Sequence, residues 1–209
     1  YSYPVKTPSY IPQIAFYFLT GHKDAANKLT LFGKIAHHSN GQDGNFYTDD
    51  GKVNLQSGNF ATNYLELGFL QSSYSQNLKA FKFIKSSVEI HPKSWMLEEL
   101  HGQYSGLRWH NTFLAYKLPM KTNPLPNEKQ RANFSIKAET TIMLDNFNNW
   151  NYFDAKRLNA SLILYYHPKF LEDIGFFVQF YQGMDYYNIY FQHQISSIRF
   201  GIMTETLRF

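Results

Sequence analysis

The sequence predicts an all-β chain that folds as an antiparallel transmembrane β-barrel. Segments that alternate between apolar and polar residues recur along the whole chain. Aromatic residues make up 18% of it, and Phe and Tyr favour strands and membrane interfaces. No run of about 18 apolar residues is present, so a transmembrane helix is not expected. A barrel strand needs only about 10 residues of alternating character, which leaves the overall composition polar.

Nine segments show this alternation, and none shows a convincing helical period. The sixth is the clearest, with Phe134, Ile136 and Ala138 on one face and Ser135 and Lys137 on the other. The fourth is ambiguous, because Lys82 falls on its more apolar face. The expected strands are residues 10–20, 28–39, 61–73, 78–91, 106–117, 132–145, 157–167, 172–182 and 196–208.

The predicted connections alternate between short and long. The short ones lie near residues 21–27, 74–77 and 168–171, and the long ones at 40–60, 92–105, 146–156 and 183–195; the link at 118–131 is the exception. Outer-membrane barrels have tight turns on one side and long loops on the other. The last residues, Leu207, Arg208 and Phe209, resemble the terminal aromatic assembly signal of such proteins. The alternation therefore favours a bacterial outer-membrane location.

Composition limits the other possibilities. Residues 1–209 form one ordered domain, because 44% of them are hydrophobic and only 17% are charged. The absence of Cys excludes disulfides, thiol catalysis and Cys-based zinc sites. The net charge of +4 comes from scattered Lys and Arg, so we expect contact with anionic lipid headgroups and no nucleic-acid partner. Single-chain bacterial barrels have even strand numbers, so nine strands imply further strands before Tyr1 or a miscounted strand.

Three polar side chains lie on strand faces that are otherwise apolar. His37 and Ser39 follow Leu31 and Ile35 on one face of the second strand, and Asn63 shares a face with apolar neighbours on the third. Side chains two residues apart on a strand lie side by side, so His37 could activate the Ser39 hydroxyl as a general base. The Asn63 amide oxygen could accept a hydrogen bond from one imidazole nitrogen and leave the other for the serine proton. His38 falls on the opposite face and is not expected to act as the base.

These residues resemble the motif of a known protein family. The segment His37-His38-Ser39-Asn40-Gly41, followed after a loop by residues 57–64, resembles outer-membrane phospholipase A. The similarity extends along nearly the whole chain, as if about three leading strands of a roughly twelve-stranded barrel were absent. The resemblance implies an N-terminally truncated barrel, hydrolysis of phospholipid acyl esters by a Ser39-His37-Asn63 triad on the barrel exterior, dependence on calcium, and activity as a homodimer.

The resemblance also implies calcium ligands. Gln42 matches the first position and would contribute its backbone carbonyl; for the second, Asn59 fits by its distance from Asn63 and Ser57 fits by residue type. Ser2 matches a ligand supplied across the dimer interface. Oxygen ligands suit calcium, and a cation near Ser39 would stabilise an oxyanion. Asp43, Asp49 and Asp50 in the same loop are either additional ligands or ordinary solvated residues.

The sequence is also compatible with two other functions. A lipid A deacylase barrel also carries a His-x-Ser pair, but its third member is expected to be Glu, which disfavours it here. A passive porin or structural barrel would make the polar trio incidental. The other histidines, including His91 and His110, are interpreted as interface or loop residues, and Trp95, Trp109 and Trp150 as an aromatic girdle.

Overall fold

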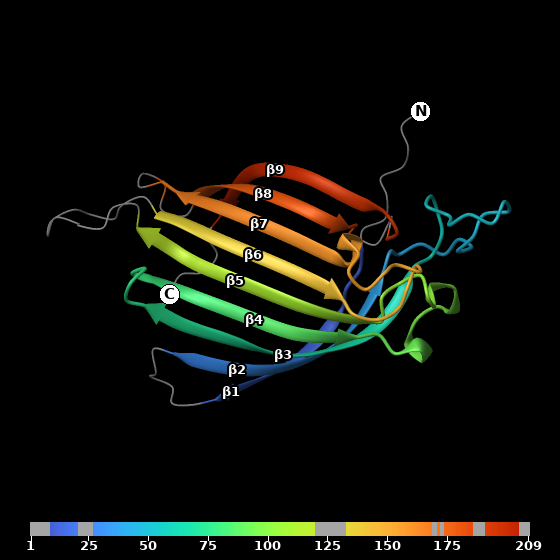
Figure 1. The fold of residues 1–209 in the computed structure, drawn as a ribbon, viewed down its shortest axis with the longest axis horizontal. Coiled ribbons are helices and arrows are strands. Elements are labelled where there is room, and N and C mark those ends of the chain that lie inside the picture. Colours follow the sequence, from blue (N-terminus) through green and yellow to red (C-terminus); the bar gives the residue numbers. More distant parts are fainter. Residues whose placement is uncertain are drawn as a thin grey trace, which may run out of the picture.

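A computed structural model describes residues 9–20, 27–119, 133–168, 171, 174–185 and 191–204. It contains a single nine-stranded antiparallel sheet in which each strand pairs with the next along the chain (Figure 1). The strands are β1 (Gln13–Thr20), β2 (Lys28–Ser39), β3 (Ala61–Ser75), β4 (Ala80–Ile90), β5 (Leu107–Pro119), β6 (Asn133–Met143), β7 (Leu158–His167), β8 (Ile174–Met184) and β9 (Gln194–Thr204). The predicted all-β antiparallel fold and its nine strands are confirmed.

β2 has the predicted bounds, and the other strands begin and end within four residues of the prediction; residues 205–208 of the last predicted strand lie outside the described residues. Tyr10 forms only an isolated bridge to Ser39, so β1 begins later than expected. Three single-turn 3-10 helices, which the alternation does not reveal, lie in the connections: η1 (Lys93–Trp95), η2 (Glu98–Leu100) and η3 (Ala155–Arg157). In the part of the chain that the structure describes, no helix is long and apolar enough to cross a membrane.

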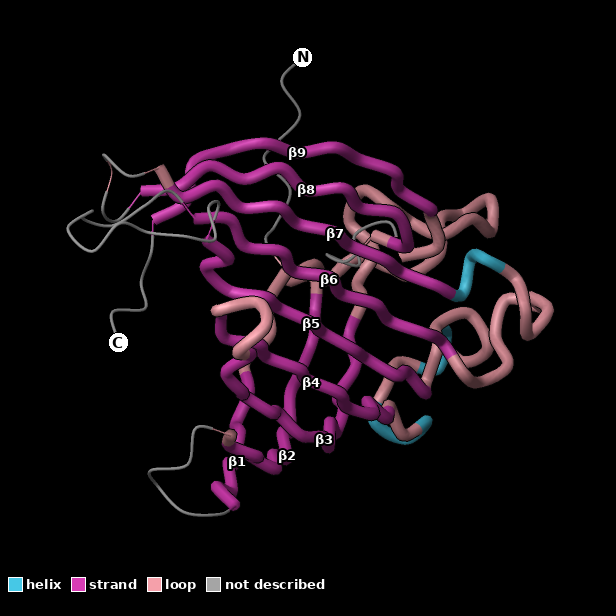
Figure 2. The backbone as a smooth tube through the Cα atoms, turned by 60° about the vertical axis from the view of Figure 1, so that its left-hand side comes forward, coloured by secondary structure: helices cyan, strands magenta, loops and turns pink. Residues whose placement is uncertain are grey.

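The sheet is strongly curved along its strand order, with β1 and β9 as its two edge strands (Figure 2). The curvature brings distant strands together on one side, where His38 of β2, Asn159 of β7 and Met184 of β8 line a single cavity of about 190 Å³. We call this side the inner face and the opposite side the outer face. The connections between β2 and β3, β4 and β5, β6 and β7, and β8 and β9 lie at one end of the strands, which we call the loop end.

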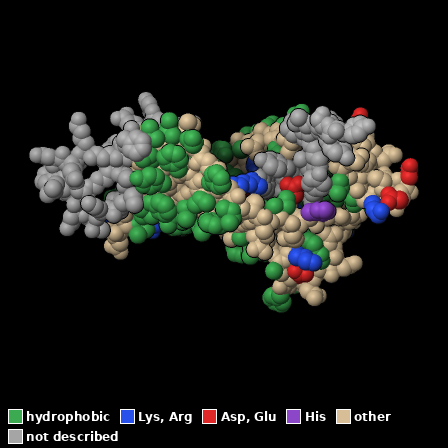
Figure 3. Space-filling model, turned by 90° about the horizontal axis from the view of Figure 1, so that it is seen from above, with side chains coloured by type: hydrophobic (Ala, Val, Ile, Leu, Met, Phe, Trp, Pro, Cys, Tyr) green, Lys and Arg blue, Asp and Glu red, His purple; other side chains and the backbone are tan. Residues whose placement is uncertain are grey.

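The outer face is apolar across most of the sheet. Phe16 of β1 and Phe200 of β9 are 73% and 85% exposed. The cross-strand register places Leu67, Val88 and Trp109 in one outward row. Figure 3 shows hydrophobic side chains covering a broad area, with charged side chains gathered toward the loop end. In a soluble protein, other parts of the chain would cover an apolar area of this size. Large exposed apolar patches mark contact with a partner or a membrane.

The inner face carries charged side chains that contact one another. Glu66 of β3 is buried and forms ion pairs with Lys34 and Lys85, and it accepts a hydrogen bond from Ser87 at 2.6 Å. Buried charges are stable only when paired in this way. A polar inner face opposite an apolar outer face is the reverse of a soluble protein and is typical of strands that span a membrane.

Apolar packing is concentrated at the loop end. The larger cluster there joins three connections along the chain and consists of Phe46, Phe60, Leu100, Tyr104 and Phe191. A second cluster contains Met143, Phe147 and Met184. Because these side chains are almost fully buried, they hold the long loops against one another and fix the ends of β2 and β3 on which the candidate site lies.

Candidate active site

The candidate site lies on the outer face where β2 and β3 reach the loop end. The strands pair in a register that places His37 directly opposite Asn63 and Ser39 opposite Ala61. All three polar residues share the face of Ile35 and Leu65, which are 42% and 37% exposed. The expected placement of His37, Ser39 and Asn63 on one outward face therefore agrees with the structure. His38 points to the inner face, as expected, and is buried.

Asn63 makes two hydrogen bonds that fix the orientation of its amide. Its Nδ2 donates to the Trp95 backbone carbonyl at 3.1 Å, and its Oδ1 lies 2.9 Å from His37 Nδ1. A carbonyl can only accept, so the amide nitrogen must face Trp95 and the amide oxygen must face the imidazole. The proton of a neutral His37 is then on Nδ1, which leaves the Nε2 lone pair available to accept a proton. This is the tautomer that a general base requires.

Ser39 is held by its backbone. Its N–H donates to the Tyr10 carbonyl at 3.0 Å and its carbonyl accepts from the Tyr10 N–H at 2.8 Å. Among the described residues, no hydrogen bond joins the Ser39 hydroxyl to His37. Catalytic hydrogen bonds are often loose in a free enzyme and shorten only when substrate binds. The Ser39 side chain is thus on the same face as His37, and no other side chain of the described residues bonds to its hydroxyl.

The backbone after Ser39 offers one free donor. The Asn40 N–H donates to the Phe60 carbonyl at 3.1 Å. Gly41 has a positive φ of 66°, a conformation that favours glycine, and its N–H has no hydrogen-bond partner within the described ranges. Its N–H is therefore available to an oxyanion that forms next to Ser39.

A groove runs beside the imidazole on the outer face. It has a volume of about 480 Å³, and its lining combines His37 and Asn63 with Ile14 and Ile35 and the ring of Trp95. Most of the lining is apolar, and Gln13 of β1 adds one further polar side chain to it. Such a surface can hold an acyl chain with its ester close to the imidazole.

The expected calcium ligands Gln42, Ser57 and Asn59 all lie in the loop between β2 and β3, where Gln42 Nε2 donates to the Gln56 carbonyl at 2.6 Å. The Gly44 N–H donates to the Ser57 carbonyl at 2.7 Å, and the Asn59 N–H donates to the Gly44 carbonyl at 3.0 Å. A Cβ on Gly44 would lie 2.1 Å from the Ser57 carbonyl oxygen, so only glycine permits this approach. Ser2 lies outside the described residues.

These residues suit calcium in kind, because each can offer an oxygen atom. In the described part of the loop, the Gln42 carbonyl and the Asn59 side chain accept no hydrogen bond, whereas Ser57 Oγ accepts one from Asn54 at 3.2 Å. Asn59 is therefore the better candidate of the two alternatives for the second position.

The loop acids behave as solvated residues. Asp50 is exposed and forms a 2.6 Å ion pair with Lys52, and hydrogen bonds from Lys52 and Thr48 lower the pKa of its carboxyl. No group of three or more His, Asp or Glu side chains that could hold a metal is found among the described residues. Asp43 and Asp49 are exposed as well.

Two residues escaped the sequence interpretation. Trp95 was assigned to the aromatic girdle, yet its backbone carbonyl orients Asn63; backbone groups leave no residue-type signal. His91 was assigned to an interface or loop, but it is buried and lies 2.9 Å from Thr62 Oγ1 and 2.7 Å from Glu89 Oε1. His91 does lie in the connection after β4, as expected, but its buried side chain also belongs to the inner-face network behind Asn63.

Comparisons with protein-family models, with curated proteins and with solved structures found no match.

Proposed function

We propose that this chain is an outer-membrane β-barrel ester hydrolase, a calcium-dependent phospholipase A that acts on membrane phospholipids. The observation that carries the proposal is the 2.9 Å contact between His37 Nδ1 and Asn63 Oδ1 on the outer face, with Ser39 next to them on the same face. A hydrogen-bonded imidazole–amide pair on a lipid-facing wall needs a reason, because polar groups in hydrocarbon are costly. Activation of a serine gives that reason.

In the proposed reaction the Ser39 hydroxyl oxygen attacks the acyl carbonyl carbon and its proton passes to His37 Nε2. The imidazolium is stabilised by donation from Nδ1–H to Asn63 Oδ1, and Gly41 N–H donates to the oxyanion. Collapse of the intermediate breaks the ester bond, and the leaving lysophospholipid oxygen takes the proton from Nε2. Water then attacks the acyl-enzyme with His37 as base, which releases the fatty acid and restores Ser39.

Calcium, when bound by Gln42 and Asn59 or Ser57, would supply a positive charge that stabilises the oxyanion. From the same resemblance we further propose that the active form is a homodimer, in which Ser2 of the second copy is a calcium ligand. Substrate would enter from the outer leaflet along the apolar outer face, so that the acyl chain reaches the groove beside His37 without crossing water.

The test is Ser39→Ala in purified protein, measured as fatty acid released from phosphatidylethanolamine in mixed micelles with calcium. We expect hydrolysis to fall to the level without enzyme while the fold, followed by circular dichroism, is unchanged. The matched control is Ser73→Ala, on the outer face of β3 but remote from His37, which keeps full activity. Undiminished hydrolysis by Ser39→Ala would falsify the triad.

The same assay distinguishes the two alternative functions. A lipid A deacylase would release acyl chains from lipid A and leave phospholipid intact, which mass spectrometry of the products distinguishes. A passive barrel would release no fatty acid from either lipid.

A further inference from the structure

A row with three polar side chains crosses the outer face on β6 to β9, away from Ser39 on β2. The register aligns Thr140 of β6, Ala160 of β7, Gln182 of β8 and Ser196 of β9 side by side. The next row away from the loop end is apolar and consists of Ala138, Leu162, Phe180 and Ile198. β4 and β5 separate both rows from β3, so they do not belong to the candidate active site.

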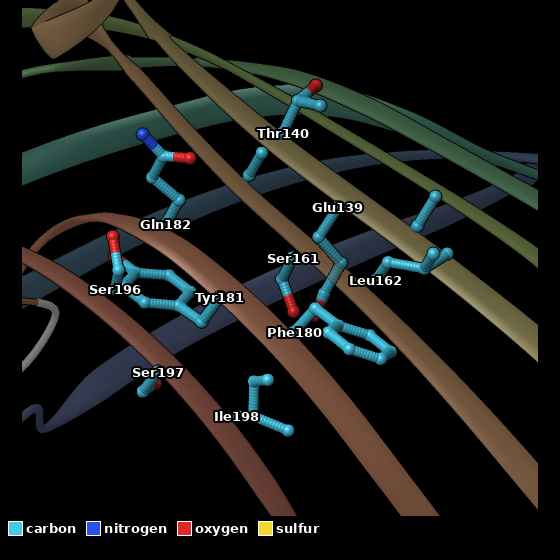
Figure 4. A pocket seen from close by; sticks show the side chains of 12 residues that line it. Glu139, Thr140, Ser161, Leu162, Phe180, Tyr181, Gln182, Ser196, Ser197 and Ile198 are labelled. Carbon is cyan, nitrogen blue, oxygen red and sulfur yellow. The ribbon is translucent and has the colours of Figure 1, made fainter.

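The two rows enclose a groove of about 620 Å³, which we call the outer groove. Its floor is low because Ala138 and Ala160 are small, whereas Phe180 and Ile198 are large and 42% and 69% exposed. Figure 4 shows Thr140, Gln182 and Ser196 toward one side of it and Leu162, Phe180 and Ile198 toward the other. The outer groove is thus divided into a polar and an apolar part.

The polar side chains of this row have no hydrogen-bond partner in the part of the chain that the structure describes. The side chains of Thr140, Gln182 and Ser196 make no hydrogen bond with any of the residues that the structure describes. By contrast, Ser86 and Asn111, which extend the same row onto β4 and β5, bond to each other at 2.8 Å. An unbonded amide on a wall that faces hydrocarbon is costly, so an external oxygen is its natural partner.

The charge of the lining residues indicates which part of a lipid the outer groove could bind. Glu139 is the one charged residue among those that line the outer groove, and the register places its side chain on the inner face, where it pairs with Lys137 at 2.8 Å. The lining therefore complements an uncharged group and offers nothing to a phosphate. The polar row also lies nearer the loop end than the apolar row. A lipid in the outer leaflet has the same order, with its ester groups above its acyl chains.

We propose that the outer groove is a second lipid site, which binds an acyl ester of a membrane glycerolipid without hydrolysing it. The acyl chain lies on Leu162, Phe180 and Ile198, and the ester carbonyl accepts a hydrogen bond from Gln182 Nε2. Thr140 and Ser196 supply further hydroxyl donors. This site rests on the proposed membrane placement of the outer face, but it does not depend on the chemistry at Ser39.

The experiment is lipid titration followed by native mass spectrometry, with Ser39→Ala as the parent so that no probe is hydrolysed. The probes are dioleoyl phosphatidylcholine, dioleoyl phosphatidylglycerol and the dialkyl ether analogue of the first. We expect one tightly retained lipid with either headgroup, and about fivefold to tenfold weaker retention of the ether, as expected for the loss of one hydrogen bond.

Two substitutions locate the site. Ala160→Phe fills the outer groove and removes the retained lipid, whereas Ile136→Phe, on the outer face of β6 but outside the groove, binds as the parent does. Gln182→Leu keeps the shape and abolishes the preference for ester over ether.

Three results would overturn the proposal. Equal loss in Ala160→Phe and Ile136→Phe would mean that only unspecific lipid surrounds the protein. Equal binding of ester and ether by the parent would remove the role of Gln182. A change in the number of protein copies in Ala160→Phe, with lipid binding unaltered, would assign the groove to a protein partner. None of these readouts involves hydrolysis, so failure here is distinct from failure of the proposed esterase.

Discussion

The two faces of the sheet treat polar side chains differently. On the inner face, Glu66 contacts two lysines and a serine, and Glu89 lies within 2.7 Å of His91 and 3.3 Å of His110. On the outer face at β2 and β3, the chain of contacts runs from the Trp95 carbonyl through Asn63 to His37 and then stops. His37 Nε2 has no hydrogen-bond partner among the described residues.

We therefore expect the paired inner-face network to contribute to stability and the outer site to contribute to the proposed function. A buried polar network whose charges are paired holds a fold together, and removing one member leaves an unpaired charge. A chain that ends in an unpaired ring nitrogen adds little to stability but leaves a base ready for an external proton. Substitutions on the inner face should therefore change the free energy of unfolding, and those at the outer site should change the rate of hydrolysis.

The largest effect is expected for His37→Ala. Loss of the general base should lower kcat/KM for phospholipid hydrolysis by about a thousandfold to ten-thousandfold, while the unfolding transition stays in place. Fatty-acid release and denaturant unfolding in the same micelles measure both quantities. A large shift in unfolding with little change in rate would reverse the assignment of this face.

Removal of calcium is expected to have the next largest effect. Excess chelator should lower the rate by about a hundredfold to a thousandfold, because one source of oxyanion stabilisation is lost, without unfolding the sheet. Restored calcium should restore the rate. Asn59→Ala should raise the calcium concentration needed for half-maximal activity more than Ser57→Ala does. Full activity in chelator would remove the metal from the mechanism.

Glu66→Ala tests the inner face. Its carboxylate is 3% exposed, and its loss leaves Lys34 and Lys85 facing one another, so we expect a loss of about 3 kcal/mol in the free energy of unfolding. The matched control is Glu139→Gln, which breaks a half-exposed pair with Lys137 and should cost less than about 1 kcal/mol. Equal unfolding midpoints for the two variants would contradict the inner-face network.

Asn63→Ala should give the smallest of these effects. The side chain orients His37 and does not react, so loss of one hydrogen bond to the imidazolium should lower kcat by about tenfold to a hundredfold. Asn63→Asp, which keeps an acceptor oxygen next to Nδ1, should recover part of that loss. A loss as large as that of His37→Ala would give Asn63 a direct part in the chemistry.

Much of the fold can be predicted from the sequence because a strand has a period of two. Alternation in residues 133–143 and 158–164 assigns the face of each side chain, and the structure confirms these assignments. The ends of strands are less readable, as Tyr10 shows, since an extended residue that forms one bridge has the same pattern as one in the ladder. The short 3-10 helices leave no periodic signal.

The sequence by itself determined the all-β class, the nine strands and the outward direction of His37, Ser39 and Asn63. Only the tertiary structure decided which of these side chains meet. A register shift of two residues between β2 and β3 would preserve every face, yet it would place Asn63 opposite Ile35 or Ser39 instead of His37. The contact with Trp95 and the depth of the outer groove likewise depend on loop packing and on neighbouring strands, because they join residues whose spacing along the chain carries no pattern.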